Sequence, residues 1–478
     1  RPVPPSSFII PHSSSSFPPA MGPTIQQPAP ALPQPSSAGP RPRIVYLAAG
    51  AAGMYCGSCL HDNTLAAALL AQGVDLLLVP TYTPIRTDET DVSQPRVLFG
   101  GINVYLQQVL PLARYIPPPF DRWLDSPRLL NLLSRLPLSV DARKLGKLTV
   151  STLRGEEGNQ RKEVDNLVDW LERDARPDLV HLSNVMLSGF ARPIARRLGV
   201  PVICSLSGED IFLEKLPEPY YSQARALLRE RAADVTQFVA LNEYYADYMA
   251  DYLSVPRGRI DVISHGLKLD GHAPRVRPIP REQTIGFLSR ICADKGLHNL
   301  VDALRLLAAD EELPAVRVVA AGYLGAADRR YLRDVTAEFK RHKLGDRFEY
   351  RGELDRDQKI AFLQSLDVLS LPSDYRESKG LPVFEAWANA VPVVLPAHGT
   401  FPELLRDTQA GLLFTPGDTA DLAAKLKHLL LDPAQADELG LRGHAAIHAR
   451  YTDRVMATRT AELYERILKA AAQRVASA

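Results

Sequence analysis

Short apolar runs alternate with amphipathic segments over most of this chain. The first example is an apolar run at Arg43–Leu47, a Gly/Ala-rich loop, an apolar helical segment at Leu60–Ala71 and a second apolar run at Val74–Val79. Short apolar runs bounded by turn residues are typical of buried strands, and their alternation with helices favours a parallel sheet. The alternation continues with apolar runs at Leu179–Leu182, Val200–Leu206, Gln237–Leu241 and Asp261–Ile263.

A second series of strands and helices begins after the proline-bearing stretch Ala273–Pro280. Two successive α/β series of similar size predict two doubly wound, Rossmann-like domains facing a cleft. We place the N-terminal domain at residues 43–275 and the C-terminal domain at residues 276–450, and a final helical segment at residues 451–478. The predicted strands of the second series are Thr284–Leu288, Val316–Ala321, Phe348–Arg351, Val368–Leu371 and Val391–Leu395.

Residues 1–42 differ from the rest of the chain, because they are rich in Pro, Ser, Gln and Ala and contain no acidic residue. Such a segment cannot bury enough apolar surface to order itself, so we predict a disordered tail. No sustained apolar stretch follows Arg1, which argues against a signal peptide. A translation start at Met21 would make residues 1–20 an artefact of gene calling.

The composition of the whole chain excludes several classes of function. A chain of 478 residues with 46% hydrophobic content can form two sizeable cores. Its net charge of +1 gives no argument for a nucleic-acid partner. Four cysteines are too few for a disulfide scaffold, and we expect a reducing, cytoplasmic location. No apolar run of about 18 residues is present, so no transmembrane helix is predicted.

The most informative feature is the pair Glu377 and Glu385, which bracket the run Ser378–Phe384. The pattern predicts a strand that ends at a loop carrying Glu377, then a helix that begins near Pro382 and carries Glu385. Gly380, Leu381 and the free N–H groups of the helix start can approach an anion between the two carboxylates. This arrangement suits a sugar nucleotide, which has hydroxyls at both ends and a diphosphate between them. The alternative is that acidic residues are simply favoured near helix N-termini.

The segment Ser373–Glu403 resembles the retaining GT-B glycosyltransferases of family 4, the glycosyl transferases group 1, whose signature is E-x7-E. The resemblance implies a GT-B fold and a donor that is a nucleoside-diphosphate sugar. It implies that Glu385 holds the ribose hydroxyls and that Glu377 holds the hydroxyls of the transferred sugar. It also implies that the helix at residues 451–478 crosses back to the first domain.

Two basic residues stand at the start of the second series, where Arg290 follows a predicted strand and Lys295 lies five positions later. Two fixed cations at one strand end can neutralise the charge on a departing diphosphate, and the pair matches the family's R-x4-K diphosphate clamp. Asp355 and Asp357 form a D-x-D sequence, but their place before an amphipathic segment favours helix capping over a metal site. We therefore predict metal-independent catalysis without a cofactor.

Further donor contacts follow from the resemblance. Gly57 matches the second glycine of a Gly-Gly pair and would let the backbone approach the donor. Gly352 and Leu354 lie where the family holds the nucleotide base, although a plain strand–helix turn fits equally. Cys56 and Cys59 form a C-x-x-C sequence, but no second ligand pair supports a zinc site.

Candidates for the acceptor and sugar side lie in the first domain. Ser207 replaces a histidine that many family members carry before Gly-Thr/Glu-Asp, whereas Asp210 matches that motif. His181 ends a predicted strand and fits a family histidine or a structural role. The basic, apolar segment 109–150 fits either peripheral docking on an inner membrane surface or a helical insertion.

The sequence therefore predicts a retaining glycosyltransferase that moves a sugar from a UDP- or GDP-sugar to a saccharide, lipid or small molecule, as in cell-envelope or polysaccharide biosynthesis. A GT-B sugar-nucleotide epimerase would share the fold and the donor site. A non-catalytic nucleotide-sugar-binding protein is the other alternative, because the motif histidine is Ser207.

Overall fold

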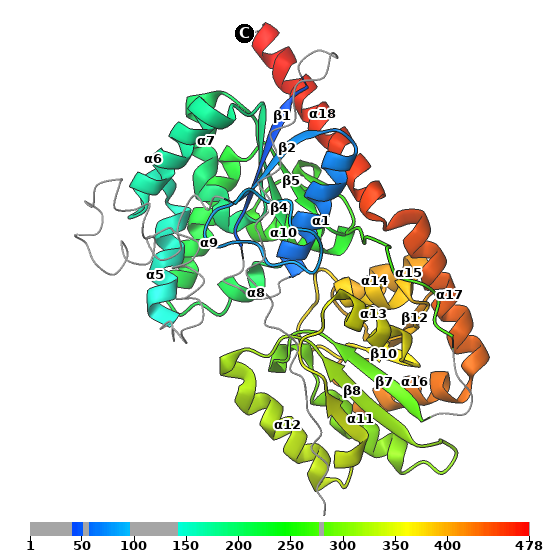
Figure 1. Cartoon of the computed structure of the whole chain (residues 1–478). Helices are drawn as coiled ribbons and strands as arrows, with labels where there is room; N and C mark the ends of the chain where they lie inside the picture. Colours follow the sequence, from blue (N-terminus) through cyan, green and yellow to red (C-terminus); the bar gives the residue numbers. More distant parts are fainter. Residues whose placement is uncertain (1–40, 51–56, 96–141, 277–281, 478) are drawn as a thin grey trace, which may run out of the picture. The chain divides into compact units, whose positions relative to one another are not determined.

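A computed structural model of the chain describes residues 41–50, 57–95, 142–276 and 282–477 (Figure 1). Three regions singled out in the sequence lie wholly or mostly outside these residues. They are the N-terminal tail, the loop that contains Cys56, and the basic segment 109–150 up to residue 141.

The first lobe is built on a sheet of six parallel strands in the order β2-β1-β3-β4-β5-β6. Side chains of β1 alternate between two cores, because successive residues of a strand point to opposite faces. Ile44 and Tyr46 belong to the core on one face of the sheet, and Val45 and Leu47 belong to the core on the opposite face. The strands are β1 (Arg43–Ala48), β2 (Asp75–Pro80), β3 (Leu179–Leu182), β4 (Val202–Leu206), β5 (Gln237–Ala240) and β6 (Ile260–Val262).

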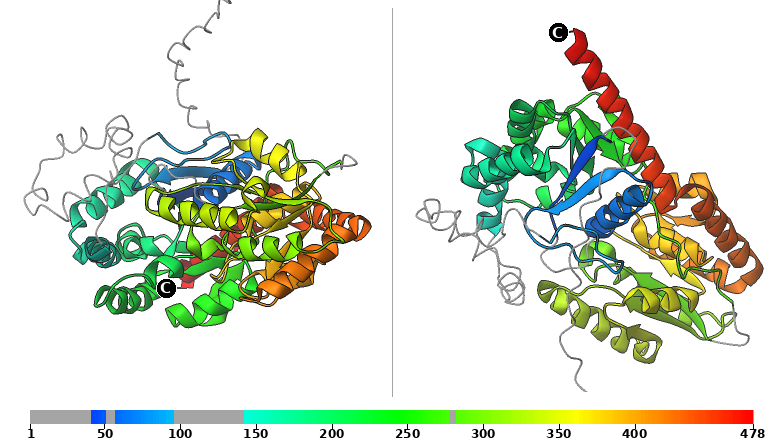
Figure 2. Two further views of the ribbon diagram at one scale, coloured as in Figure 1. Left: turned by 90° about the horizontal axis from the view of Figure 1, so that it is seen from below. Right: turned by 45° about the horizontal axis from the view of Figure 1, so that its top comes forward.

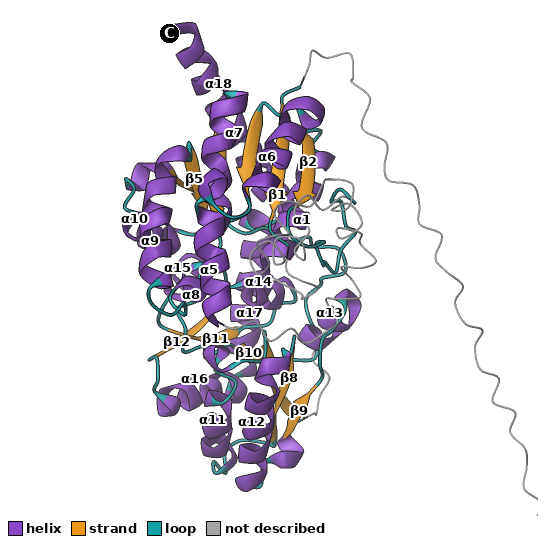
Figure 3. Ribbon diagram, turned by 90° about the vertical axis from the view of Figure 1, so that its left-hand side faces the viewer, coloured by secondary structure: helices purple, strands orange, loops and turns teal. Residues whose placement is uncertain are grey.

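Helices cover both faces of this sheet, as a fully parallel sheet requires (Figures 1 and 3). One face carries α1 (Gly57–Ala71). The helices on the other face are α5 (Ala142–Leu153), α6 (Arg161–Trp170), α7 (Ala191–Leu198), α9 (Tyr220–Arg231) and α10 (Glu243–Leu253), with the short α8 (Asp210–Leu213) before α9.

The second lobe repeats this plan with six parallel strands in the order β12-β11-β10-β7-β8-β9. The strands are β7 (Gln283–Leu288), β8 (Val316–Ala321), β9 (Phe348–Tyr350), β10 (Val368–Ser370), β11 (Val393–Pro396) and β12 (Gly411–Phe414). The helices are α11 (Asn299–Ala308), α12 (Arg329–Arg341), α13 (Arg356–Gln364), α14 (Leu381–Ala388), α15 (Phe401–Thr408), α16 (Thr419–Leu431) and α17 (Pro433–Arg450). Together the two sheets confirm the predicted pair of Rossmann-like lobes.

The last helix, α18 (Asp453–Ser477), follows the second lobe in sequence but packs on the first (Figure 2). Met456, Leu463 and Tyr464 lie in the same core as the strand residues Ile44 and Tyr46. The crossing point is fixed by backbone pairing between Leu267 and Thr452. The first-lobe core is therefore completed by the C-terminal segment.

Candidate active site

The loop between β10 and α14 carries the two glutamates and is shaped by Gly380. This residue has φ 73°, a left-handed conformation, and a side chain there would lie 3.1 Å from Leu404 Cδ1. Glycine is the residue that accepts such a backbone without strain. The helix begins at Leu381, with Pro382 in its first turn as predicted. Glu377 is thereby held on the loop and Glu385 one turn into the helix.

Glu377 forms an ion pair with Lys295, the residue expected in the diphosphate clamp. Both side chains are more than four-fifths buried, at 14% and 19% exposure. Burial opposes the charge of Glu377, but Lys295 and Lys379 outweigh it, and the pKa of this carboxyl lies below its usual value. Glu377 is thus a carboxylate near neutral pH, able to accept hydrogen bonds from sugar hydroxyls.

Arg290 lies just beyond the end of β7 and does not contact Glu377. Its Nε and Nη2 atoms both lie 3.3 Å from Cys292 Sγ. Among the described residues no carboxylate forms an ion pair with Arg290. Of the two cations expected to form the clamp, Lys295 is therefore paired with Glu377, and Arg290 has no carboxylate partner among the described residues.

Glu385 is paired with a lysine that sequence reasoning missed. Lys359 on α13 lies 2.6 Å from Glu385 Oε1 and 2.6 Å from Asp88 Oδ2 of the first lobe. Burial opposes the charge on Lys359, but the two carboxylates reverse the effect and raise its pKa. Nothing in the local sequence marks Lys359, because Asp88 and Glu385 reach it only through the tertiary fold.

Two more ion pairs join the same first-lobe segment to the second lobe. Arg86 lies 3.1 Å from Glu353, and Glu89 lies 3.5 Å from Arg356. A cavity beside Glu385 lies between the lobes and has a volume of about 20 Å³, enough for one water molecule. The space beside Glu385 is therefore closed by Asp88 and Glu89 of the first lobe.

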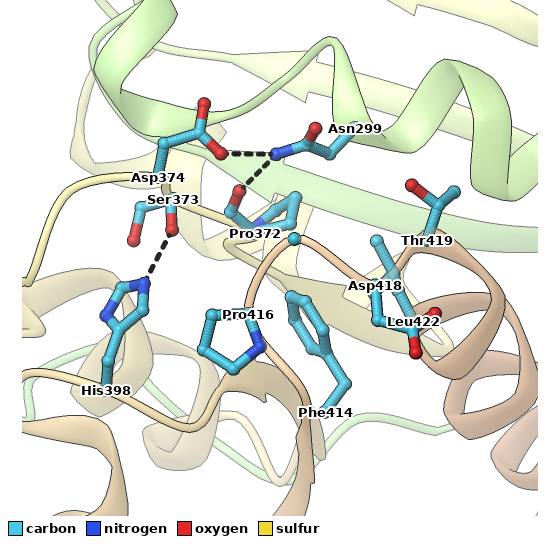
Figure 4. Close-up of a pocket in the computed structure, with 11 residues that line it drawn as sticks. Asn299, Pro372, Ser373, Asp374, His398, Phe414, Pro416, Asp418, Thr419 and Leu422 are labelled. Carbon is cyan, nitrogen blue, oxygen red and sulfur yellow. Dashed lines mark hydrogen bonds between the residues drawn. The ribbon is translucent and has the colours of Figure 1, made fainter.

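A larger cavity than the one beside Glu385, about 270 Å³, is elsewhere on the second lobe (Figure 4). Asn299 bridges the Pro372 carbonyl and Asp374 at its rim, and the His398 ring hydrogen-bonds the Ser373 carbonyl. None of the residues predicted for the donor or the acceptor lines it. Size alone does not identify the site here, and we place the site at the two glutamates.

The start of α1 in the first lobe faces the start of α14 in the second. Gly57 is the first residue of α1, and a side chain there would lie 4.0 Å from Leu381. Lys379 spans the two lobes, because its Nζ lies 2.5 Å from the Ser58 hydroxyl. The structure therefore brings Gly57 close to Gly380 and Leu381, with Lys379 as a further residue that was not selected from the sequence.

Two buried histidines lie beside this point and are neutral. Nδ1 of His61 and Nδ1 of His265 are 2.8 Å apart, so one ring donates and the other accepts. Burial, with a smaller effect of Lys379, lowers the pKa of His61 to about 3. For His265, burial, the neighbouring His61 and Lys379 shift the pKa in the same direction. Neither residue was selected from the sequence.

The loop after β4 presents Ser207 but keeps its acidic residues engaged. Glu209 accepts hydrogen bonds from the Ser207 backbone N–H at 2.8 Å and from its hydroxyl at 3.1 Å. Asp210 accepts from the Tyr245 hydroxyl at 2.7 Å. Burial raises the pKa of both Glu209 and Asp210. Ser207 thus lies on the loop, and Asp210 begins α8 with its carboxylate turned into the lobe.

His181 is placed in the core of the first lobe, where its side chain is 1% exposed. One ring nitrogen lies 2.8 Å from the Tyr464 hydroxyl and the other 2.8 Å from the Ser205 hydroxyl. Both ring nitrogens are engaged, so the structure supports the structural role for His181 and not the acceptor-side one. The reason is that Tyr464 of α18 packs against the end of β3 and occupies one ring nitrogen of His181, a contact that the local sequence does not indicate.

The base-binding candidates and the D-x-D sequence lie near the cross-lobe ion pairs. Gly352 has φ 78°, and a Cβ added there would meet no atom within 4 Å. Leu354 packs against the second-lobe core. The Asp355 carboxylate accepts from the Gln358 N–H at 2.9 Å in a reciprocal capping box, which confirms the capping interpretation. Among the described residues, no group of three or more His, Cys, Asp or Glu side chains is arranged to hold a metal ion.

Comparison with known proteins identifies the family to which this chain belongs. Residues 273–445 match the family of glycosyl transferases group 1, and residues 63–266 match the glycosyl transferase 4-like domain. A 2-deoxystreptamine glucosyltransferase of Streptomyces kanamyceticus is 28% identical over 309 residues, 58% of this chain and 77% of that protein. The chain belongs to the group 1 glycosyltransferases of family 4, and it is an enzyme of the transferase class.

Solved structures show the same fold at low sequence identity. Sucrose-phosphate synthase from Thermosynechococcus elongatus superposes with a TM-score of 0.65 at 17% identity, over 90% of this chain and all of that one. The HepE protein of Anabaena in complex with UDP-glucose gives 0.60 at 16% identity, over 88% and 99% of the two chains. The GT-B architecture expected from the sequence is confirmed. Within the described residues, no helix is long and apolar enough to cross a membrane.

Proposed function

We propose that this protein is a retaining glycosyltransferase whose donor is a nucleoside-diphosphate sugar and whose catalysis needs no metal ion. The observation that carries the proposal is the arrangement of Glu377 and Glu385 around the start of α14. Glu377 lies on the loop before α14 and Glu385 lies within the helix. In this arrangement each carboxylate can meet one end of a donor, and the helix start between them suits a diphosphate. The UDP-glucose complex of the HepE protein is a GT-B precedent for such a donor.

In this proposal, the donor ribose replaces Lys359 as the partner of Glu385, and the transferred sugar meets Glu377. Arg290 and Lys295 neutralise the departing diphosphate, the role that a metal ion has in other transferases. Closure of the lobes excludes water, which would otherwise hydrolyse the donor. The acceptor is a saccharide, a lipid or a small molecule bound on the first-lobe side, near Ser207.

The test is a thermal-shift screen of UDP-, GDP- and ADP-sugars, followed by turnover of the donor that stabilises the protein, with and without EDTA. We expect one nucleotide class to raise the melting temperature, turnover that EDTA leaves in place, and a product that keeps the donor's anomeric configuration by NMR. Loss of activity in EDTA, restored by Mn²⁺ or Mg²⁺, would contradict the metal-independent part. An isomerised donor formed without acceptor would indicate an epimerase instead.

A further inference from the structure

Lys379 belongs to the E-x7-E loop of the second lobe, and its side chain reaches the first lobe. Its Nζ lies 2.5 Å from the hydroxyl of Ser58, in the first turn of α1. The ammonium lies near enough to Glu209, His61 and His265 to affect the pKa of all three groups. One side chain thus occupies the space where the two lobes meet.

Lys379 lies among charges of both signs, because it favours the charged forms of both Glu377 and Glu209. Neither α1 nor α14 has an acidic residue in its first turn, so both helix starts keep their partial positive charge. Within the described part of the chain, Lys379 forms no ion pair with a carboxylate; its partner is the Ser58 hydroxyl. A lysine in this position, beside the Lys295–Glu377 pair, suits an anionic group of a ligand.

We propose that Lys379 contacts the β-phosphate of the leaving nucleoside diphosphate and is a third cationic residue for that group, beside Arg290 and Lys295. This inference rests on the proposed function and deepens it. Gly57 and Ser58 at the start of α1 face the same phosphate from the first lobe. The contacts of Gly57 and Ser58 form only when both lobes surround the donor, because these residues belong to the first lobe and Lys379 to the second.

The chemistry gives this contact a role in the rate. In the transfer step the bond between the anomeric carbon and the β-phosphate oxygen breaks, and its electron pair remains on that oxygen. A bond forms between the acceptor oxygen and the anomeric carbon, and the acceptor proton passes to the departing phosphate. The negative charge on the diphosphate grows as the bond breaks, so a cation fixed beside it stabilises the transition state more than the ground state.

A purely structural role is the alternative, in which Lys379 only ties the lobes together. Lys215 provides a matched control, because its ion pair with Asp294 also joins the first lobe to the second. Lys215 is 59% exposed on its side chain and is not part of the candidate site. Lys379→Met and Lys215→Met therefore each remove one lysine contact between the lobes, and only the first removes a proposed phosphate contact.

The experiment measures affinity by calorimetry for matched nucleotide pairs, UDP with UMP, GDP with GMP and ADP with AMP, on the full chain. For the pair that binds, we expect Lys379→Met to weaken the diphosphate about tenfold or more and to leave the monophosphate within about twofold. Lys379→Arg should recover most of the diphosphate affinity, and Lys215→Met should change neither. With the donor sugar, Lys379→Met should lower kcat more than it raises KM.

Each other outcome overturns the inference. Equal diphosphate affinity in wild type and Lys379→Met would remove the phosphate contact. Equal losses for monophosphate and diphosphate, with the same pattern in Lys215→Met, would leave only the bridging role. A wild-type protein that binds none of the nucleotides would overturn the proposed function as well, which separates the two failures.

Discussion

The two glutamates of the candidate site are neutralised in different ways. Glu377 is paired with Lys295 of its own lobe, eighty-two residues earlier in the chain. Glu385 is paired with Lys359, which is also held by Asp88 from the opposite lobe. The ion pair of Glu377 therefore lies within the second lobe, and the ion pair of Glu385 is tied to the first lobe through Asp88.

This difference has a consequence for binding. In the proposed function, the sugar meets Glu377, whose ion pair lies within one lobe, and the ribose displaces Lys359, which bridges the two lobes. The proposal therefore couples donor binding to lobe movement through the ribose. Conformational steps of this kind often limit turnover in enzymes that close around their substrates.

The largest effect is expected from removing the bridging cation. Lys359→Met leaves Asp88 and Glu385 buried without their common partner, at 8% and 6% side-chain exposure. Breaking a buried ion pair from one side costs about 3–5 kcal/mol, so the free energy of unfolding should fall by this order. Urea titration measures it. Adding Asp88→Asn should restore part of the loss, and a single variant as stable as the wild type would contradict the bridging role.

The second prediction separates the two carboxylates by their ligands. Glu377→Gln should lower kcat about a hundredfold, because the lost contact strengthens in the transition state, while nucleotide affinity stays or rises as Lys295 is released. Glu385→Gln should weaken free nucleotide and nucleotide sugar alike. Calorimetry and initial rates on both variants make the test. Equal loss of nucleotide binding in the two variants would show that the assigned roles are wrong.

The third prediction concerns the two cations proposed to hold the diphosphate. Arg290→Ala and Lys295→Ala each remove a charge-assisted contact worth about 1.5–3 kcal/mol, which corresponds to at least tenfold weaker binding of the nucleoside diphosphate. Arg290→Ala should leave the melting temperature unchanged, since no described carboxylate pairs with Arg290. Lys295→Ala should lower it, because Glu377 loses its partner. Unchanged affinity in both variants would remove the clamp.

Local sequence signals predicted the parts of the molecule that depend on neighbours in the chain. Apolar runs located most strands, the proline at the start of α14 set the loop and helix positions of the glutamates, and Asp355 was identified as a cap. Lys359, Lys379 and Asp88 were missed because their partners lie far away in sequence and no periodic pattern marks them. His181 shows the same limit, since its environment is set by Tyr464 of α18, the last helix of the chain.

The smallest effect tests that reassignment of His181 through the pH dependence of stability. Burial lowers the pKa of His181 to about 3 in the folded protein, against about 6.5 in an unfolded chain. Below about pH 6.5 the unfolded chain therefore binds a proton that the folded protein does not bind. The contribution of His181 to the free energy of unfolding is complete above about pH 6.5 and is lost as the pH falls toward 3. Between about pH 7 and pH 5.5 the wild type should lose about 1.3 kcal/mol of unfolding free energy that His181→Gln does not lose.

Other buried groups titrate equally in both proteins, so their effects cancel in the comparison of wild type with His181→Gln. These groups are His61 and His265, whose pKa values are lowered, and Glu209 and Asp210, whose pKa values are raised. Denaturant titrations of the two proteins at both pH values give the difference directly. Parallel pH dependences would mean that the His181 ring takes up its proton at the same pH in the folded and the unfolded protein. It would then be open to solvent and to a ligand, as the acceptor-side role requires.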